Sequence, residues 1–305
     1  MSGNRFDVCV IGGGLAGLMA AHEATTYGLS VGLVETLMPG GLIANVGAVA
    51  GYPGGEPSGA EIAATLLERA QAGGVVWVMG EVDALDASGA VKSISVAGGG
   101  TLSADQVVIA SGATLRRLNV PGEREYEGRG VSQCAFCDAG LYKDRAAIVV
   151  GGGDGALQEA LHLTEYCDNV TLVHRRMRLR ARRHYVEQAA NNPNIAFKWN
   201  AEVQAIVGND NGVTGAVIKA KNKEPETVAA DGVFVFVGCE PATAFLDDPF
   251  RHDESGALVV DPSLRTSVPG VYAAGAVRAD FAGQVTNAMS DGALAVRTLV
   301  ADGSG

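Results

Sequence analysis

A glycine-rich turn that occurs twice at constant spacing constrains the fold of this chain more than any other feature. The first copy comprises Gly12, Gly14 and Gly17. The second copy, at one constant offset of 139 residues, comprises Gly151, Gly153 and Ala156. Each turn follows a short apolar run and precedes an Ala- and Leu-rich helical stretch and a second apolar run, which ends at Glu35 or at His174. Strand, glycine turn, helix and strand predict a βαβ unit, so we expect two dinucleotide-binding folds.

The 305 residues suit two domains of about 150 residues each. After the second unit, the apolar run 271–274 and the helical run 289–300 lack a glycine turn of their own, so we expect them to return to the first domain. The predicted fold class is therefore α/β, with two Rossmann-like, three-layer domains of which the second is inserted into the first. The predicted boundaries are 1–114 plus 244–305 for the first domain and 115–243 for the second.

Charge and composition exclude several classes of protein. The formal net charge of −11 disfavours nucleic acid as a partner of the whole molecule. No apolar stretch reaches the roughly 18–20 residues that cross a bilayer, and the first residues make a poor signal peptide, so no membrane partner is expected. Five cysteines are an odd number for a disulfide-stapled secreted fold, and a reducing, cytoplasmic setting is the expectation.

The first glycine turn predicts a flavin dinucleotide. In such a turn the first glycine makes the bend, the second lets backbone N–H groups approach a pyrophosphate, and the third lets helix and strand pack closely. A single match also occurs in glycine-rich strand–helix turns of other α/β proteins, but two equally spaced copies favour nucleotide binding. Glu35, at the strand end, can accept hydrogen bonds from ribose hydroxyls and would repel a 2′-phosphate. We therefore predict FAD at this turn.

The second glycine turn has a basic strand end instead. His174 is followed by six arginines within ten positions, namely Arg175, Arg176, Arg178, Arg180, Arg182 and Arg183. A guanidinium pairs a phosphate in bidentate fashion, which favours NADPH over NADH. A solvated basic face or a nucleic-acid patch is the alternative reading, but the cluster lies where the second fold needs it.

A pair of cysteines, Cys134 and Cys137, lies directly before the second unit. Two thiols at this spacing at the start of a helix can close a disulfide, and a helix N-terminus lowers a thiol pKa. A zinc site would need two further ligands, and the nearby His162 and Cys167 lack ligand spacing. An inert pair is the remaining alternative to a redox pair. Asp138 next to the pair is a sensible proton donor for a thiolate.

With these motifs the chain resembles the low-molecular-weight thioredoxin reductases over nearly its whole length. The matching segments are the turn 12–17 with Glu35, Gly40-Gly41, 52–54, 110–113, 134–138, 151–156 with Glu159, 174–180, 266–275 and Gln284. The resemblance implies a homodimer with an FAD domain split around an NADPH domain that rotates, and hydride transfer from NADPH through FAD to the cysteines. It further implies that Cys137 faces the flavin and begins exchange with the substrate disulfide, that Cys134 resolves the mixed disulfide, and that Asp138 protonates the departing thiolate.

The resemblance also implies two sets of cofactor-binding residues. The predicted FAD set is Gly12, Gly14, Leu15, Ala16, Gly17, Glu35, Gly41, Leu42, Gly112, Gly275, Gln284 and Val285. The predicted NADPH set is Gly151, Gly153, Asp154, Gly155, Ala156, His174, Arg175, Arg176 and Arg180. No metal is expected.

The chain departs from the family pattern around the flavin and at the partner surface. Ala276 replaces the aspartate that holds the ribitol chain, Leu42 replaces a glutamine, and Gly51 and Gly283 replace an asparagine and an arginine. Losing one charge-assisted hydrogen bond of roughly 1.5–3 kcal/mol could weaken FAD about tenfold to a hundredfold. Two phenylalanines that dock thioredoxin in the family are Gly140-Leu141 here, whereas a docking arginine is retained as Arg129.

The leading prediction is an FAD-dependent, NADPH-dependent disulfide reductase acting on thioredoxin or a thioredoxin-like dithiol carrier. An oxidase that closes disulfides in small dithiols with O₂ is a second reading, which the retained 174–176 segment disfavours. A third is a flavin- or nucleotide-binding redox module that has drifted to another role, suggested by Ala276 and disfavoured by the intact cysteine pair. A specialised lipoyl or ferredoxin-type carrier is a further possible partner.

Overall fold

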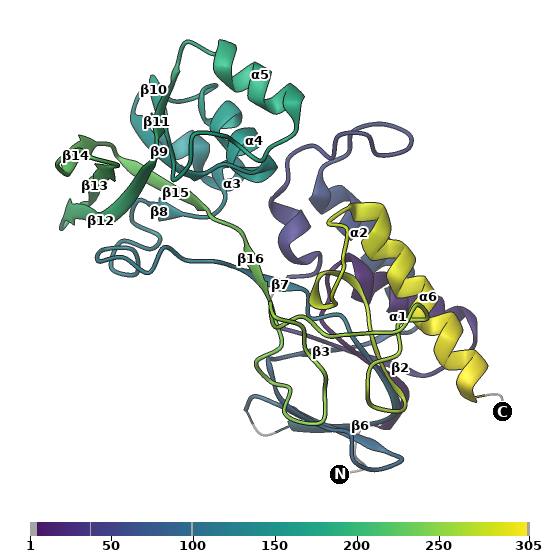
Figure 1. The fold of residues 1–305 in the computed structure, drawn as a ribbon. Coiled ribbons are helices and arrows are strands. Elements are labelled where there is room, and N and C mark those ends of the chain that lie inside the picture. The colour runs from purple at the N-terminus through teal and green to yellow at the C-terminus, as the bar shows by residue number, and fades with distance from the viewer. Residues whose placement is uncertain (1–4, 37, 99, 304–305) are drawn as a thin grey trace. The chain divides into compact units, whose positions relative to one another are not determined.

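The computed structural model describes residues 5–36, 38–98 and 100–303, which form two compact units (Figure 1). Unit 1 comprises Met1–Thr114 and Glu240–Gly305, and unit 2 comprises Leu115–Cys239. Each unit has parallel strands covered by helices, which confirms the predicted α/β class. Among the residues described, no helix is long and apolar enough to cross a membrane.

Unit 1 is built on one mixed sheet. Its strands are β1 (Arg5–Ile11), β2 (Val31–Glu35), β3 (Val76–Met79), β4 (Val82–Asp86), β5 (Lys92–Val96), β6 (Gly100–Ile109) and β17 (Val271–Ala273). The order is β3-β2-β1-β6-β5-β4, parallel through β6 and antiparallel beyond it. The end of β6 also pairs in parallel with β17, so the last part of the chain completes the sheet begun by the first.

Helices cover one face of this sheet. Figure 1 shows α1 (Leu15–Thr26), α2 (Gly59–Ala72) and α6 (Val285–Gly303) lying together on that face. Fully buried Leu18, Leu33 and Leu66 belong to the core between helices and sheet. On the opposite face, Ile94 and Ile109 pack with Leu258 and other residues of the loops after unit 2. Burying apolar side chains on both faces is what holds these layers together.

The start of α2 shows how the sequence sets a local boundary. The Ser58 hydroxyl accepts the Glu61 N–H, and the Glu61 carboxylate accepts the Ser58 N–H at 2.7 Å. This reciprocal capping box satisfies two backbone donors at the helix start, as the spacing of Ser58 and Glu61 predicts. The helix ends at Ala72 and Gly73 is its C-cap, followed by Gly74 with φ of +85°, where an L side chain would be strained.

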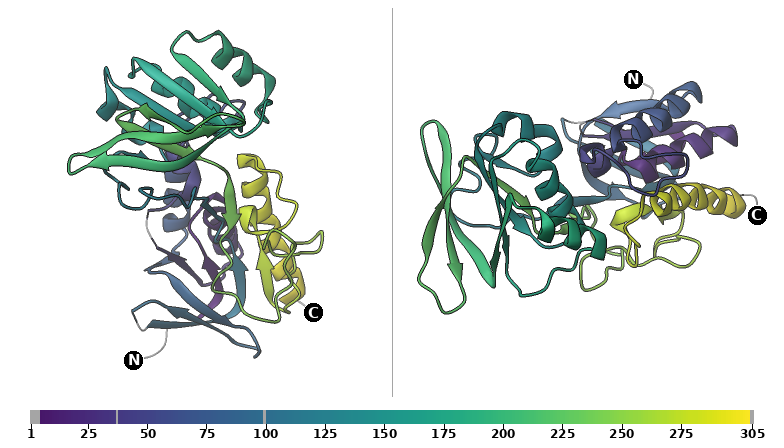
Figure 2. Two further views of the ribbon diagram at one scale, coloured as in Figure 1. Left: turned by 60° about the vertical axis from the view of Figure 1, so that its left-hand side comes forward. Right: turned by 90° about the horizontal axis from the view of Figure 1, so that it is seen from above.

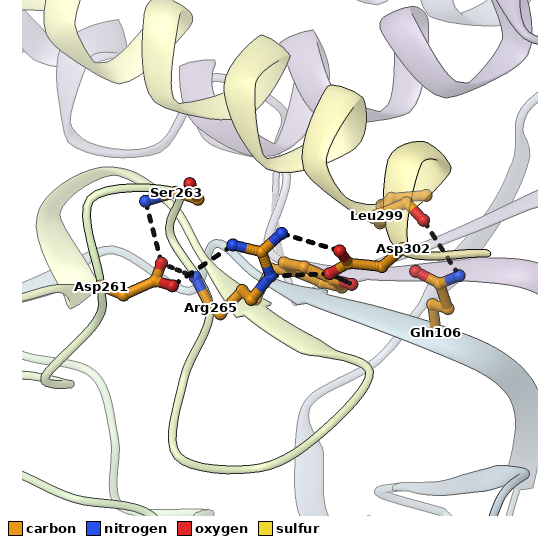
Figure 3. Close-up of polar contacts among 7 residues, drawn as sticks. Gln106, Asp261, Ser263, Arg265, Leu299 and Asp302 are labelled. Atoms are coloured by element: carbon orange, nitrogen blue, oxygen red, sulfur yellow. Dashed lines mark hydrogen bonds and ion pairs between the residues drawn. The ribbon is translucent and has the colours of Figure 1, made fainter. Parts of the chain in front are cut away.

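The far end of α6 is tied to the loop before β17 by a charged cluster (Figure 3). The Arg265 guanidinium donates to both carboxylate oxygens of Asp302 at 2.7 Å, and to Asp261 at 3.3 Å. The buried Tyr272 hydroxyl donates to Asp302 at 2.9 Å. These hydrogen bonds lower the pKa of Asp302 to about 2. The cluster therefore fixes the last turn of α6 against β17.

Unit 2 has a parallel sheet of its own, with the order β11-β10-β9-β15-β8. Its strands are β8 (Val131–Ser132), β9 (Ala146–Gly151), β10 (Asn169–His174), β11 (Ile195–Trp199) and β15 (Gly232–Phe236). Its helices are α3 (Ala135–Asp138), α4 (Asp154–Leu163) and α5 (Arg183–Asn191), with a 3₁₀ turn over Ala139–Tyr142. An antiparallel meander follows, formed by β12 (Ala201–Asn209), β13 (Gly212–Ala220) and β14 (Glu226–Ala229).

Three layers result in unit 2, as both views of Figure 2 show. The helices pack on one face of the parallel sheet, where Leu157, Leu163 and Phe234 are fully buried. The meander packs on the other face, where Ile218 meets Ile148 and Val233. At the two crossings between the units, β7 (Ala113–Leu115) and β16 (Cys239–Pro241) pair as a two-stranded ladder.

Candidate active site

The first glycine turn joins β1 to α1, and each of its three glycines has the separate role that the sequence predicts. Gly12 has φ of +102°, and a Cβ there would overlap the Ala110 carbonyl. A Cβ on Gly17 would overlap the Gly12 carbonyl oxygen, so this glycine lets α1 approach the strand. Gly14 faces open space, with no atom nearer to an added Cβ than the Gly40 carbonyl oxygen at 3.9 Å. The middle glycine is thus the one that leaves room for a ligand.

The N-terminus of α1 is open to an anion. Gly14 is its N-cap, no side chain caps it, and its first turn has no acidic residue. The first helical hydrogen bond runs from the Leu18 N–H to the Gly14 carbonyl, which leaves the N–H groups of Leu15, Ala16 and Gly17 directed at the turn. This donor set and the space above Gly14 fit the pyrophosphate of a dinucleotide.

Other predicted flavin residues gather around this turn. Glu35 accepts the Gly13 N–H at 2.6 Å. The Gly40 N–H donates to the Gly13 carbonyl, and a Cβ on Gly41 would lie 3.3 Å from the Gly14 Cα. On the helix side, a Cβ on Gly275 would lie 2.8 Å from the Ala16 Cβ.

The remaining predicted flavin residues lie at element ends of the same unit. Gly112, with φ of +72°, follows the Ala110–Ser111 segment that Gly12 touches. Leu42 is 40% exposed in the 3₁₀ turn Gly41–Asn45, and Gln284 is exposed immediately before Val285, the first residue of α6. Unit 1 therefore contains all members of the predicted flavin set.

The turn that holds Ala276 contains a buried ion pair which the sequence reading missed. The Asp291 carboxylate on α6 accepts a hydrogen bond from the Gly275 N–H at 3.0 Å. It also accepts a bidentate pair of hydrogen bonds from Nε and Nη2 of Arg278, at 2.7 and 3.0 Å. Asp291 is 7% exposed. The Asp291 carboxylate therefore holds this turn in place, through contacts that no short sequence motif indicates.

The second glycine turn repeats the first in unit 2. A Cβ on Gly151 would overlap the Phe236 carbonyl and lie 2.7 Å from the Ala156 Cβ, whereas Gly153 and Gly155 face open space. Gly153 is the N-cap of α4, again without a side-chain cap. Asp154 in the first turn of α4 pairs with Arg182 at 2.6 Å.

The basic segment after β10 divides into two groups. His174 is 7% exposed, its ring lies against Gly152, and its Nε2 is 3.1 Å from the Arg178 carbonyl oxygen. Arg182 and Arg183 have carboxylate partners. In contrast, Arg175, Arg176, Arg178 and Arg180 are exposed and form no ion pair with any residue that the structure describes. The Arg180 N–H donates to the Gly152 carbonyl at 2.8 Å, which holds the backbone of this segment beside the turn. Four uncompensated cations here fit a phosphate.

Cys134 and Cys137 form a disulfide across the short helix α3 in unit 2. Cys134 is buried and Cys137 is exposed. Cys134 is the N-cap of α3, and its Sγ accepts the Cys137 N–H at 3.1 Å. Asp138, the last residue of α3, is partly exposed one position after Cys137. The two sulfur atoms are bonded to each other, so the pair is in the state that accepts two electrons to become two thiols.

The other cysteines lie elsewhere. Cys9 is buried in β1, and this burial raises the pKa of its thiol to about 12. Burial also raises the pKa of Cys167, to about 11. A thiol at either position stays protonated at neutral pH and is unreactive. Within the described ranges, no group of three or more His, Cys, Asp or Glu side chains could hold a metal ion.

Comparison with known proteins identifies the family. The sequence profile of pyridine nucleotide-disulphide oxidoreductases matches residues 6–292. The chain belongs to this family. As a pyridine nucleotide-disulphide oxidoreductase, it is an enzyme of the class that uses a flavin and a nicotinamide nucleotide.

The relatives of this pyridine nucleotide-disulphide oxidoreductase confirm the resemblance found in the sequence. It is 40% identical to a thioredoxin reductase of Listeria monocytogenes, over 95% of this chain and 91% of the relative. It is 39% identical to a thioredoxin reductase of Treponema pallidum, over 95% and 94% of the two chains. The crystal structure of Lactococcus lactis thioredoxin reductase, in its FR conformation, superposes with a TM-score of 0.92 at 35% identity, covering 97% of this chain and 98% of that one.

Proposed function

We propose that the protein is an FAD-dependent NADPH:disulfide oxidoreductase that reduces thioredoxin or a thioredoxin-like dithiol carrier through Cys134 and Cys137. The observation that carries this proposal is the disulfide on α3, which lies in the same unit as a glycine turn flanked by uncompensated arginines. A nucleotide reductant and a reducible disulfide are the two things that such an enzyme must hold.

The two glycine turns divide the cofactors between the units. In unit 1, Glu35 at the end of β2 favours the unphosphorylated adenosine ribose of FAD, because a carboxylate repels a 2′-phosphate. In unit 2, the exposed Arg175, Arg176 and Arg180 favour the 2′-phosphate of NADPH. The buried His174 supports the turn through Gly152 and leaves phosphate binding to the arginines.

A bound flavin would supply the two-electron connection between reduced nicotinamide and the disulfide. The protein's residues then act on the thiols. The exposed Cys137 is placed to attack a substrate disulfide, forming a mixed disulfide and releasing one substrate thiolate. The buried Cys134 attacks the Cys137 sulfur, which restores the internal disulfide and releases the second thiolate, and Asp138 donates a proton to a departing thiolate. Each cycle moves two electrons from NADPH to one substrate disulfide.

The partner surface differs from the pattern of the family at one point. Leu141 is 71% exposed just after α3, where an apolar side chain can contact a protein substrate. Arg129 bonds the Glu125 carbonyl at 3.0 Å and lies over the Tyr126 ring, so its guanidinium is already oriented. We propose thioredoxin as the partner and a homodimer as the working form, which light scattering of the purified protein tests.

The proposal is tested by following NADPH oxidation with oxidised thioredoxin as the acceptor. Cys137→Ser is expected to abolish turnover, whereas Cys239→Ser, which removes an exposed cysteine outside the pair, should leave it unchanged. A colourless protein that takes up no FAD, or an unchanged rate in the Cys137→Ser variant, would overturn the proposal. Oxygen uptake with small dithiols and no NADPH would favour an oxidase instead.

A further inference from the structure

The four backbone N–H groups of α3 all donate hydrogen bonds. Two of them donate to a side chain that lies outside the cysteine motif. The Ala135 and Phe136 N–H groups both donate to Oε2 of Glu159, at 2.7 and 3.1 Å. The Cys137 N–H donates to the Cys134 Sγ, and the Asp138 N–H to the Cys134 carbonyl at 3.2 Å. Only one of the four donors is therefore directed at sulfur.

Glu159 comes from a rigid neighbouring element. It lies on α4, which packs directly against α3, and it is partly buried. A carboxylate in this position adds a negative charge beside the first residues of α3, where the Cys134 sulfur is also attached. Burial raises the pKa of Glu159, and the two amide hydrogen bonds and the nearby His162 oppose that effect.

We propose that Glu159 is a positioning residue for the cysteine pair: its side chain fixes the start of α3, and its charge disfavours the thiolate form of the reduced cysteines. The proposal rests on the redox role proposed above. It extends that role to the reduced state, in which amide N–H groups would otherwise stabilise a thiolate. A thiol with a raised pKa reacts more slowly with disulfides and oxidants at neutral pH, because the thiolate is the reacting form.

Other ionisable groups around α3 are placed differently. Asp138 is at the end of α3, and Tyr142 lies in the turn that follows. His162 is one turn beyond Glu159 on α4. Its ring lies tilted by 38° against the Phe136 ring, with centroids 5.4 Å apart, and its Nδ1 lies 3.5 Å from Glu165. Among the described residues, Glu159 alone gives its carboxylate to the amides of the cysteine helix.

The test measures the reactivity of the reduced cysteines directly. Glu159→Gln keeps the shape and an oxygen acceptor but removes the charge. In a Cys239→Ser background, the Cys134–Cys137 disulfide is first reduced with excess dithiothreitol, which is then removed. The rate of alkylation by iodoacetamide is recorded against pH, and mass spectrometry locates the modified sulfur. A nearby like charge disfavours the thiolate form and raises a thiol pKa, here on the order of one unit. The half-maximal pH should therefore fall by about one unit, giving about tenfold faster alkylation at pH 7.

Two further variants make the result decisive. Glu165→Gln removes a 67% exposed charge from the same neighbourhood without touching α3, and should leave the alkylation profile unchanged. Glu159→Asp keeps the charge and should give a profile close to that of the unmodified enzyme, which tests the proposal even if Glu159→Gln does not fold. An unchanged profile in Glu159→Gln, or an equal shift in Glu165→Gln or Glu159→Asp, would overturn it. Because alkylation requires no FAD, NADPH or thioredoxin, failure of the proposed function would appear separately, as loss of NADPH-dependent turnover.

Discussion

The glycines of the first turn have separable tasks, and two alanine substitutions should separate them. In Gly17→Ala the new methyl overlaps the Gly12 carbonyl oxygen and lies 3.3 Å from the Ala110 Cβ, so α1 must move away from β1. Overpacking of this kind costs about 1–3 kcal/mol. For a unit of this size, where 1 kcal/mol corresponds to about 2–4 °C, we expect the melting temperature of flavin-free protein to fall by roughly 2–12 °C.

Gly14→Ala is the matched control for this effect. Gly14 has φ of −70° and ψ of 179°, which alanine adopts without strain, and the nearest atom to its new Cβ is 3.9 Å away. We expect the melting temperature without flavin to stay within about 1 °C of the original. The methyl would occupy the space that we propose for the pyrophosphate, so FAD affinity should fall at least about tenfold, roughly 1.4 kcal/mol.

The assay pairs thermal unfolding, followed by circular dichroism with and without FAD, with a flavin titration followed by absorbance. Equal destabilisation by the two substitutions in the absence of FAD would refute the division of labour. So would a Gly14→Ala protein that binds FAD with unchanged affinity, because the open space above Gly14 would then not be the dinucleotide site.

Three further outcomes follow from contacts described above. Changing Arg175 and Arg176 together to Ala should raise the KM for NADPH about tenfold to a hundredfold and leave that for NADH nearly unchanged, as steady-state kinetics would show; equal effects would contradict phosphate recognition. The pKa of Asp302 is lowered to about 2 from 3.8, so its stabilising effect is complete above about pH 4 and is lost between pH 4 and 2. In Asp302→Asn, the free energy of unfolding should therefore depend less on pH between about pH 4 and 2, as denaturant melts at several pH values would show. The difference should be clearest at low salt, because Arg265 is 40% exposed and salt screens its charge. Gly292→Ala should destabilise unit 1 by about 1–3 kcal/mol in denaturant melts, because its methyl overlaps the backbone of α1.

Local sequence predicted the parts of the fold that local physics determines. The two βαβ units are confirmed, because apolar periodicity and glycine turns act over a few residues. The helix expected from residue 289 begins earlier, at Val285, since its first turn is only partly apolar. Strands β4 and β11 and helix α5 were missed because their segments are short or mixed in polarity.

Contacts between residues far apart in the chain could not be predicted from local sequence. Glu159 was recognised as part of a motif, but its bonds to the amides of α3 span more than twenty positions. The pairing of Asp291 with Arg278, and of Asp302 with Arg265, likewise depends on how α6 packs. The buried Asp291 could be suspected from its place on an otherwise apolar helix face, although a single sequence does not reveal which base it meets, whereas the exposed Asp302 gives no such signal.

The discontinuity of unit 1 has a consequence for how the polypeptide is made. When residue 114 has left the ribosome, β6 and α1 still lack their partners β17 and α6, which begin only at Val271 and Val285, more than 150 residues later. At typical elongation rates that interval lasts on the order of ten seconds. Throughout it, the nascent chain exposes the apolar flank of α1 that α6 later covers, so this is the period in which a chaperone would be needed and in which aggregation would begin.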